Sequence, residues 1–523
     1  MLYPLRQKVP VRVGGLLITL MVFIVAFRCV PERVARPTFH PDGGNFPDSI
    51  DVIIYCGTEG ATIRYTTDGS DPDGTSTEYT GPINVTSTAT MKARGFKGGM
   101  SSSTVASATF TIFPPRTIRR VSISSSGEEG NGKSWLPSIS ADGRYVAFTS
   151  EASNLVGGDT NGTIDVFVHD CQTGETTRVS VTSNGDQARY GGVSPSISGN
   201  GRYVAFQSLS SDLVDGDTNG RMDVFVHDRE TGQTTRVSVS SSGEEGNDIS
   251  WSPSISADGR YVAFESIASN LVEGDTNEGW DVFVHDRRQP GQTTRVSVSS
   301  SGEEGNGDSK WHDISPDGRW VAFSSEADNL VDGDTNENMD VFVHDCLMGG
   351  TTRVSVNSSG EEDTGCGAIS RLPSISVYGR YVAFESAASD LVDGDINGKW
   401  DVFVHDCHEG WTAIVSLSSS GDQGNCASSF ASISDDGCSV AFESCADDLV
   451  AGDTNGFDDV FVNDCETEET TRVSVSRSQA NHGCFCPSIS ADGRFVAFQS
   501  LADNLVDGDT NKNVDIFVYY RGP

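Results

Sequence analysis

The chain alternates short apolar runs with clusters of Gly, Asn, Asp and Ser, and this pattern repeats over most of its length. Residues 252–301 give its clearest form, SPSISADGRYVAFESIASNLVEGDTNEGWDVFVHDRRQPGQTTRVSVSSS. The Val of the RVS segment recurs every 58 to 61 residues, at Val121, Val179, Val237, Val296, Val354, Val415 and Val473. A fixed period of this size is typical of solenoids, arrays and propellers.

Each repeat contains four β-prone runs, PSIS, RYVAFES, DVFVHD and TTRVSV, bounded by turn residues. Asp-Gly or Asn-Gly joins the first two runs, as at Asp258-Gly259, and favours a tight hairpin. The Tyr-Val-Ala-Phe part of the second run is nearly all apolar, which indicates burial on both faces. Four antiparallel strands per repeat, without a helical period, predict an all-β fold with a seven-bladed β-propeller over residues 117–523.

The repeat resembles a known family. ISPDGRWVAFSS (314–325), ISADGRYVAFES (255–266) and VFVHDRETG (224–232) look like the WD40-like (PD40) propeller repeat of the TolB family. The resemblance covers about 400 residues and implies a fold and a tendency to bind partners, without implying a particular reaction.

Residues 36–113 differ from the repeats and contain short alternating strands at sandwich spacing. YTTDGSDP, YTGPI and MKARGF resemble the small immunoglobulin-like (Ig-like) domain at the carboxyl end of chitobiase and β-hexosaminidase enzymes. That resemblance implies an accessory domain and brings no catalytic residue. We therefore expect a small Ig-like β-sandwich before the propeller, with Pro114-Pro115 as a stiff linker.

The repeats also predict how the ring closes. The propeller region begins with an isolated fourth strand, IRRVSI (118–123), and ends after a third strand, DIFVYY (515–520). We expect residues 118–123 to complete the last blade, because this pairing hides both edges of the sheet.

Residues 1–30 indicate export. Arg6, Lys8 and Arg12 precede an uncharged run, Val13 to Phe27, that suits a signal peptide or an uncleaved signal anchor. Both alternatives place the rest of the chain outside the cell or at its surface, with membrane contact only through this segment. The formal charge of −38 disfavours binding to nucleic acid and favours cations or basic partners.

The cysteines follow the blades. Cys171, Cys346, Cys407 and Cys465 follow third strands, and Cys366, Cys426, Cys484 and Cys486 precede first strands. Antiparallel pairing predicts that Cys438 and Cys465 lie within bridging range, with Cα atoms less than about 7 Å apart. Cys171 has no such neighbour and is expected to be a free thiol.

Two sets of side chains are candidates for chemistry in the blades. Five histidines at one strand position (His169, His227, His285, His344 and His405) lie in separate blades, so we expect each to bond within its own blade. Aromatic residues precede several first strands, and we take Trp135, Trp251, Trp311 and Phe485 as candidate ligand-binding residues. They would stack on sugar rings or hold a peptide, or alternatively wedge between blades.

The loops between second and third strands are candidate calcium sites. In blade 2 the loop places oxygen ligands at positions 1, 3, 5 and 9 and a Gly at position 6, as an EF-hand loop begins, and it is similar to the calcium hairpins of integrin-type propellers. The alternative is that Asp and Asn only cap the turn. The candidate metal ligands are Asp215, Asp217, Asn219, Asp223; Asp332, Asp334, Asn336, Asp340; Asp393, Asp395, Asn397, Asp401; and Asp507, Asp509, Asn511, Asp515.

Two functions remain open from the sequence. The first is an exported, non-catalytic binding or scaffold propeller, stabilised by calcium, that engages protein or carbohydrate partners. The second is a polysaccharide-acting hydrolase or lyase, which is suggested by the enzymes in which the accessory domain usually occurs. No nucleophile motif, HExxH or phosphate loop occurs. A cluster of acidic or His side chains at the channel mouth would favour the enzyme.

Overall fold

The computed structural model describes residues 8–13, 16–21, 33–114, 116–288, 291–363 and 369–522. The chain divides into two compact units, Met1–Gly44 with Ser49–Ile112, and Asn45–Asp48 with Phe113–Pro523. Apart from one short 3₁₀ turn, Val377–Gly379, every regular element of the described residues is a strand. The all-β expectation is therefore confirmed.

Residues 38–113 form two sheets with a small apolar core. One sheet has the order β3 (Thr38–His40), β5 (Ile50–Tyr55), β8 (Ile83–Val85), and the other the order β4 (Gly44–Pro47), β10 (Ala106–Phe113), β9 (Ala89–Phe96), β6 (Thr62–Thr66), β7 (Thr77–Glu78). Along β10 buried and exposed residues alternate, as expected for a strand with one solvated face. Val52, Met91 and Phe110 are fully buried between the sheets.

The predicted targeting segment lies partly outside the described residues. Its described part forms a two-stranded antiparallel hairpin, β1 (Lys8–Val13) and β2 (Leu16–Met21). Among the described residues, no helix has the length and hydropathy needed to span a membrane.

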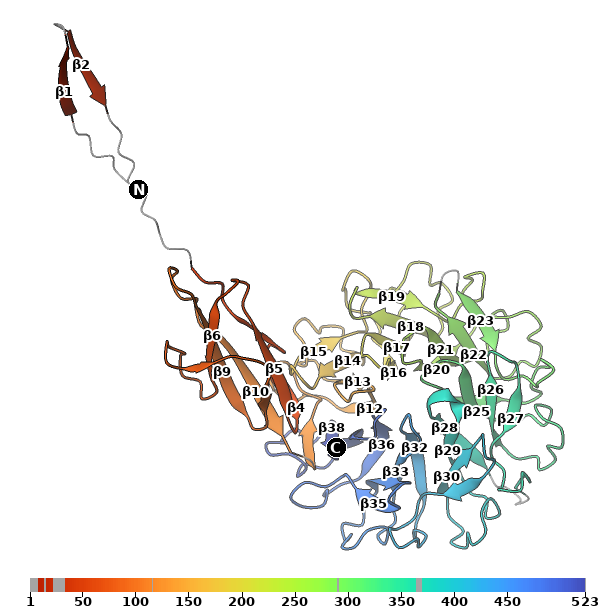
Figure 1. The fold of residues 1–523 in the computed structure, drawn as a ribbon. Coiled ribbons are helices and arrows are strands. Elements are labelled where there is room, and N and C mark those ends of the chain that lie inside the picture. The colour runs from red at the N-terminus through yellow and green to blue at the C-terminus, as the bar shows by residue number, and fades with distance from the viewer. Residues whose placement is uncertain are drawn as a thin grey trace. The chain divides into compact units, whose positions relative to one another are not determined.

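In the second unit the described residues form seven four-stranded antiparallel sheets around a common axis (Figure 1). We number these sheets as blades 1 to 7 along the chain. Blade 1 is β12 (Ser134–Ile139), β13 (Tyr145–Ser150), β14 (Asp165–Asp170), β15 (Thr176–Arg178); blade 2 is β16 (Val193–Ile197), β17 (Tyr203–Ser208), β18 (Asp223–Asp228), β19 (Gln233–Arg236); blade 3 is β20 (Ser250–Ile255), β21 (Tyr261–Ser266), β22 (Asp281–Asp286), β23 (Gln292–Arg295).

The remaining blades repeat this order of strands. Blade 4 is β24 (Ser309–Ile314), β25 (Trp320–Ser325), β26 (Asp340–Asp345), β27 (Thr351–Arg353); blade 5 is β28 (Ser370–Ile375), β29 (Tyr381–Ser386), β30 (Asp401–Asp406), β31 (Thr412–Ile414); blade 6 is β32 (Ser428–Ile433), β33 (Ser439–Ser444), β34 (Asp459–Asp464), β35 (Glu469–Arg472); blade 7 is β36 (Cys484–Ile489), β37 (Phe495–Ser500), β38 (Asp515–Tyr520), β11 (Thr117–Arg120).

The apolar second and third strands hold the blades together. Each blade stacks one Phe of its second strand on one of its third, such as Phe264 on Phe283, with ring centroids 5.8–6.0 Å apart. These rings are fully buried between neighbouring blades, as in the cluster that joins Phe264 and Val262 to Val224 of the preceding blade. Burial on both faces explains why the central residues of these strands, Val-Ala-Phe and Val-Phe-Val, are all apolar.

The predicted closure of the last blade is confirmed. β11 pairs antiparallel with β38, with Thr117 opposite Tyr520 and Arg120 opposite Phe517. The fourth strands are shorter than the predicted TTRVSV run, however, and β19 ends at Arg236. The reason is local: Ser238 Oγ accepts the Val224 N–H at 3.1 Å and donates to Asp223 at 2.5 Å, so a side chain takes the place of ladder bonds.

The five predicted histidines bond within their own blades, as expected. The Nδ1 atom of His227 lies 2.9 Å from Thr234 Oγ1 in the paired strand, and the same bond recurs in the other four blades. In blade 6 Asn463 takes this position and bonds Thr470 at 3.0 Å. The histidines are therefore structural.

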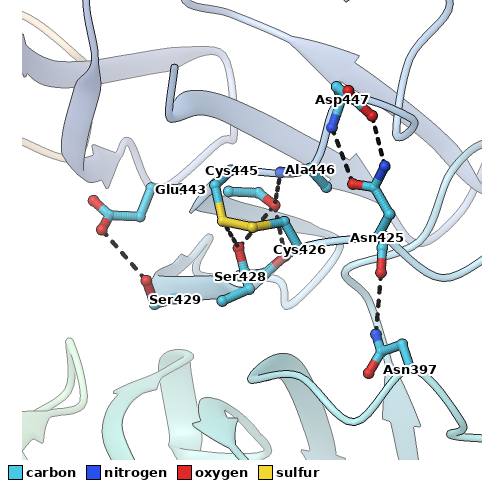
Figure 2. Close-up of a disulfide and its surroundings, with 12 residues drawn as sticks. Asn397, Asn425, Cys426, Ser428, Ser429, Glu443, Cys445, Ala446 and Asp447 are labelled. Carbon is cyan, nitrogen blue, oxygen red and sulfur yellow. Dashed lines mark hydrogen bonds between the residues drawn. A yellow bond between two sulfur atoms is a disulfide. The ribbon is translucent and has the colours of Figure 1, made fainter. Parts of the chain in front are cut away.

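The predicted cysteine bridge is wrong. The disulfide of the described residues joins Cys426, before β32, to Cys445, after β33 (Figure 2). Cys438 and Cys465 are neighbours, because the Cys465 N–H donates to the Cys438 carbonyl at 2.7 Å, but both thiols are free. Cys171 is a free, buried thiol.

Candidate functional site

The first strand of every blade contains a bulge near its middle. The pairing with the second strand shifts register there, for example between Trp251 and Ser254. One residue in each bulge has a left-handed backbone, with φ between 48° and 54°: Leu136, Ser194, Ser252, Trp311, Leu372, Phe430 and Cys486. A bulge of this kind redirects a side chain out of the sheet.

Side chains from the neighbouring blade hold most of these bulges in place. The backbone N–H of the bulge residue donates to a side chain in the second strand of the preceding blade. The accepting residue comes directly before the Ser that ends that strand. The distances are 2.6–3.2 Å for Leu136 to Gln499, Ser194 to Thr149, Ser252 to Gln207, Trp311 to Glu265, Phe430 to Glu385 and Cys486 to Glu443. The left-handed backbone is thus fixed by the contact between blades.

A second set of bonds links all first strands in sequence around the axis. In six blades the Ile that ends the first strand donates its N–H to a Ser of the preceding blade at 3.1–3.2 Å. At the remaining place Asp313 replaces this Ser and accepts the Ile375 N–H at 3.0 Å.

The bulges enclose an axial cavity of about 350 Å³. Every blade contributes its bulge residue and the residue after it, which is Pro in five blades. The lining residues are Leu136, Pro137, Ser194, Pro195, Ser252, Pro253, Trp311, His312, Leu372, Pro373, Phe430, Ala431, Cys486 and Pro487, together with Glu265. The walls are mostly apolar and are fixed by backbone geometry, so the cavity is preformed.

Blade 4 breaks the symmetry of this cavity. Its first strand carries Trp311-His312-Asp313 where blade 3 carries Ser-Pro-Ser. The His312 side chain is fully buried, its ring nitrogens have no hydrogen bond within the described residues, and Nδ1 lies 3.5 Å from Glu265 Oε1. Asp313 also accepts a hydrogen bond from Ser254 Oγ at 2.8 Å, and desolvation raises the pKa of its carboxyl.

Glu265 is the centre of this polar corner. It is 2 % exposed, and its oxygens accept the Trp311 N–H at 2.6 Å and the Trp251 Nε1–H at 2.7 Å. Two of the four predicted aromatic residues therefore meet on one buried carboxylate. Trp311 lines the cavity, whereas Trp135, Trp251 and Phe485 lie in β12, β20 and β36, outside the lining.

The cavity also contains a thiol, that of Cys486. Desolvation raises its pKa to about 12, so the thiol stays protonated at neutral pH. A protonated thiol is a poor nucleophile. The cavity therefore provides a ligand with a preformed apolar surface and with one imidazole–carboxylate pair, His312 and Glu265.

The predicted calcium loops are built around the turn-capping arrangement. In all seven loops the Asn donates its amide N–H to the Asp four residues later, at 2.7–3.3 Å. Its amide oxygen accepts the N–H two residues later. The position-1 residues Asp215, Asp332, Asp393 and Asp507 are exposed.

An arginine of the fourth strand takes the place beside the loop carboxylates in six blades. Its Nη1 lies 2.9–3.6 Å from the position-3 Asp, as for Arg236 and Asp217. Blade 5 differs, because Ile414 replaces the arginine. There Asp395 accepts a hydrogen bond from Gln423 at 3.2 Å, and burial raises the pKa of Asp401 to about 6.

Comparison with known proteins agrees with the two-part architecture. Residues 41–107 match the family model of the chitobiase/β-hexosaminidase C-terminal domain. A search of curated proteins finds no match.

Solved structures resemble the propeller at low identity. A putative TolB from Agrobacterium tumefaciens is 17 % identical, with a TM-score of 0.34, over 54 % of this chain and 80 % of that one. TolB from Acinetobacter baumannii is 14 % identical, with a TM-score of 0.32, over 68 % of this chain and 64 % of that one. An oligogalacturonate lyase in complex with manganese is 12 % identical, with a TM-score of 0.47, over 77 % and 92 %.

The strand pairing of the chain itself establishes the propeller. The protein thus combines a domain that matches the chitobiase/β-hexosaminidase C-terminal family model with a β-propeller of four-stranded blades.

The corner formed by Glu265, His312 and Asp313 is absent from the sequence-based list of candidates. The sequence does contain an indication of this cluster, because residues 311–313 depart from the Ser-Pro-Ser pattern of blade 3.

Proposed function

We propose that the protein is an exported, non-catalytic binding or scaffold protein that holds an apolar segment of a protein partner in the axial cavity. The seven sheets are then the complete set of blades of a closed seven-bladed propeller. The partner reaches the protein at the cell surface or outside the cell, nucleic acid is not a ligand, and membrane contact is confined to the N-terminal segment.

One observation carries this proposal: the axial cavity is preformed and mostly apolar, with Pro, Leu and aromatic walls from every blade. Such walls suit apolar side chains of a peptide. Carbohydrate is less well matched, because sugar rings need open aromatic faces, whereas Pro and Leu provide most of the apolar lining.

The test is a peptide array and a glycan array probed with the purified full chain. The proposal predicts peptides with apolar residues among the hits and no enrichment of glycans. Enrichment of glycans alone would refute the choice of a protein partner.

The second candidate is a polysaccharide-acting hydrolase or lyase, and the buried pair of His312 and Glu265 favours it. The double substitution H312P/D313S restores the pattern of the other blades and therefore preserves the fold. Turnover of a polysaccharide panel by the wild type that this variant loses would support the enzyme. Unchanged peptide binding without any turnover would support the binding protein.

We also propose that calcium binds in blade 5, through Asp395 and Asp401, where the arginine is missing. In the other blades a guanidinium already offsets the carboxylates. Calcium is expected to raise Tm, and I414R is expected to abolish that dependence because it supplies the missing guanidinium. If wild type and I414R respond equally to calcium and to chelator, the loops serve only as capped turns.

A further inference from the structure

The residue after each third strand decides whether the junction with the preceding blade is filled. In blades 2 and 3 this residue is Arg229 or Arg287. The guanidinium carbon of Arg229 lies 4.6 Å from the ring centroid of Tyr145 in blade 1, and its Nη1 donates to the Gly201 carbonyl at 2.5 Å. Arg287 repeats both contacts with Tyr203 and the Gly259 carbonyl.

Each of these tyrosines is contacted by two guanidinium groups. Arg144 lies 4.8 Å from the Tyr145 centroid, and Arg202 lies 4.9 Å from the Tyr203 centroid. Tyr261 of blade 3 has the corresponding first contact, with Arg260 at 4.3 Å. At the next junction, however, the residue after the third strand of blade 4 is Cys346, which is too short to supply the second contact.

A cavity of about 310 Å³ occupies this junction. Its lining includes Tyr261, Asp286, Gly318 and Cys346. Tyr261 corresponds to Tyr203, Asp286 to Asp228, and Gly318 to Gly259 in the repeat. The cavity therefore presents the same groups that surround the guanidinium of Arg287.

The charges at the two junctions also correspond. Around Arg287 the facing charged groups are Asp228, Arg202 and Asp258. At the junction between blades 3 and 4 the counterparts are Asp286, Arg260 and Asp317. Asp286 forms an ion pair with Arg260, and Asp317 accepts a hydrogen bond from Ser315 Oγ at 2.6 Å within its hairpin. Arg319 also lines the cavity, but it pairs with Asp345. Arg288 acts on the Tyr261 ring where the repeat in blade 2 has Glu230, so the balance that accommodates Arg287 is reproduced except for this one basic group.

We propose that the cavity between blades 3 and 4 binds the side chain of an arginine from a basic partner protein. The guanidinium stacks on the free face of Tyr261 and donates to the Gly318 carbonyl, as Arg287 does with Tyr203 and Gly259. Leu347 and Met348 follow Cys346 in the adjoining turn and are 72 % and 76 % exposed, which gives the partner an apolar contact.

This site is separate from the axial cavity. It is formed at the ends of third strands and at first hairpins, whereas the axial cavity is formed by the bulges of the first strands. The formal charge of −38 attracts a basic partner at long range.

The test uses N-acetyl-L-arginine amide and its neutral isostere N-acetyl-L-citrulline amide as probes of the full chain. The arginine probe should bind the wild type about ten-fold more tightly than the citrulline probe, because citrulline lacks the cation. C346R supplies the guanidinium within the chain. It should abolish arginine binding and raise Tm by about 2 °C, whereas the control C346A should keep binding.

A second pair of variants makes the test independent of how C346R folds. Y261L removes the ring and should weaken arginine binding about ten-fold, while Y261F keeps the ring and should bind as the wild type does. Equal binding of both probes, no binding to the wild type, or undiminished binding to both C346R and Y261L would overturn the proposal. W311A/F430A, which alters the axial cavity, should leave arginine binding unchanged.

Discussion

In blades 1 to 6 a hydrogen-bond relay joins the third strand to the segment that precedes the first strand of the same blade. Thr234 donates its hydroxyl hydrogen to the Val181 carbonyl at 2.5 Å, so its oxygen accepts and His227 Nδ1 carries the hydrogen. Asn463 donates to Thr470 in the same way. Burial lowers the pKa of His227 to about 4, so the folded protein holds this imidazole neutral.

This relay predicts a pH effect at one residue. A buried neutral imidazole binds fewer protons than the unfolded chain between pH 4 and 6.5, so its contribution to stability is lost as pH falls. H227N, which copies blade 6, should therefore gain about 1–2 kcal/mol relative to the wild type when the pH is lowered from 7 to 5. Denaturant unfolding at both pH values measures this difference.

The reverse substitution is the matched control. N463H should lose stability relative to the wild type over the same pH interval, because it adds one more imidazole that the fold keeps neutral. If both variants change in parallel with the wild type, the histidines are not held neutral.

At the scale of elements, one disulfide stabilises a single blade, blade 6. Cys426 and Cys445 are 19 residues apart in the sequence, and their bond (Figure 2) closes a segment that contains both β32 and β33. Closing a loop of this length stabilises a fold by about 3 kcal/mol. C426S/C445S should lower the free energy of unfolding by about that amount.

The neighbouring cysteine pair provides the control for this measurement. C438S/C465S should leave the free energy of unfolding unchanged, since these thiols are free. A loss of stability confined to C438S/C465S would restore the pairing predicted from the sequence and contradict the observed bridge.

Most strands were predictable from the sequence, because apolar runs and Asp-Gly turns are local signals. The ends of the fourth strands were not, because they depend on Ser238 and its equivalents bonding a neighbouring strand. The disulfide was missed for a similar reason. Antiparallel pairing correctly placed Cys438 beside Cys465, but pairing alone does not say whether two sulfur atoms meet.

The candidate site was predictable only in part. Trp251 and Trp311 were identified as aromatic residues before first strands, and both contact Glu265. Glu265 itself lies in an ordinary second strand. Its role depends on a bulge in the next blade, which is visible only when the blades are assembled.

At the scale of the whole molecule, closure depends on one short strand. β11 covers the edge of β38, and Ser122 donates to the buried Asp515 at 2.5 Å. Without this segment the edge of the last blade is exposed, and an unpaired edge favours aggregation.

Two truncated chains test this dependence. A chain of residues 114–523 should unfold cooperatively, whereas a chain of residues 124–523 should melt about 10 °C lower and aggregate, because it lacks β11 and exposes the edge of β38. Equal melting temperatures would mean that the ring closes without β11.

The central claim is that the axial cavity is the binding site, and one affinity measurement tests it most directly. The tightest peptide from the array is titrated into the wild type, into W311A/F430A, and into Y190A, whose exposed aromatic side chain lies outside the cavity lining. The account predicts at least about a ten-fold loss of affinity for W311A/F430A and wild-type affinity for Y190A. Wild-type affinity in W311A/F430A would contradict it.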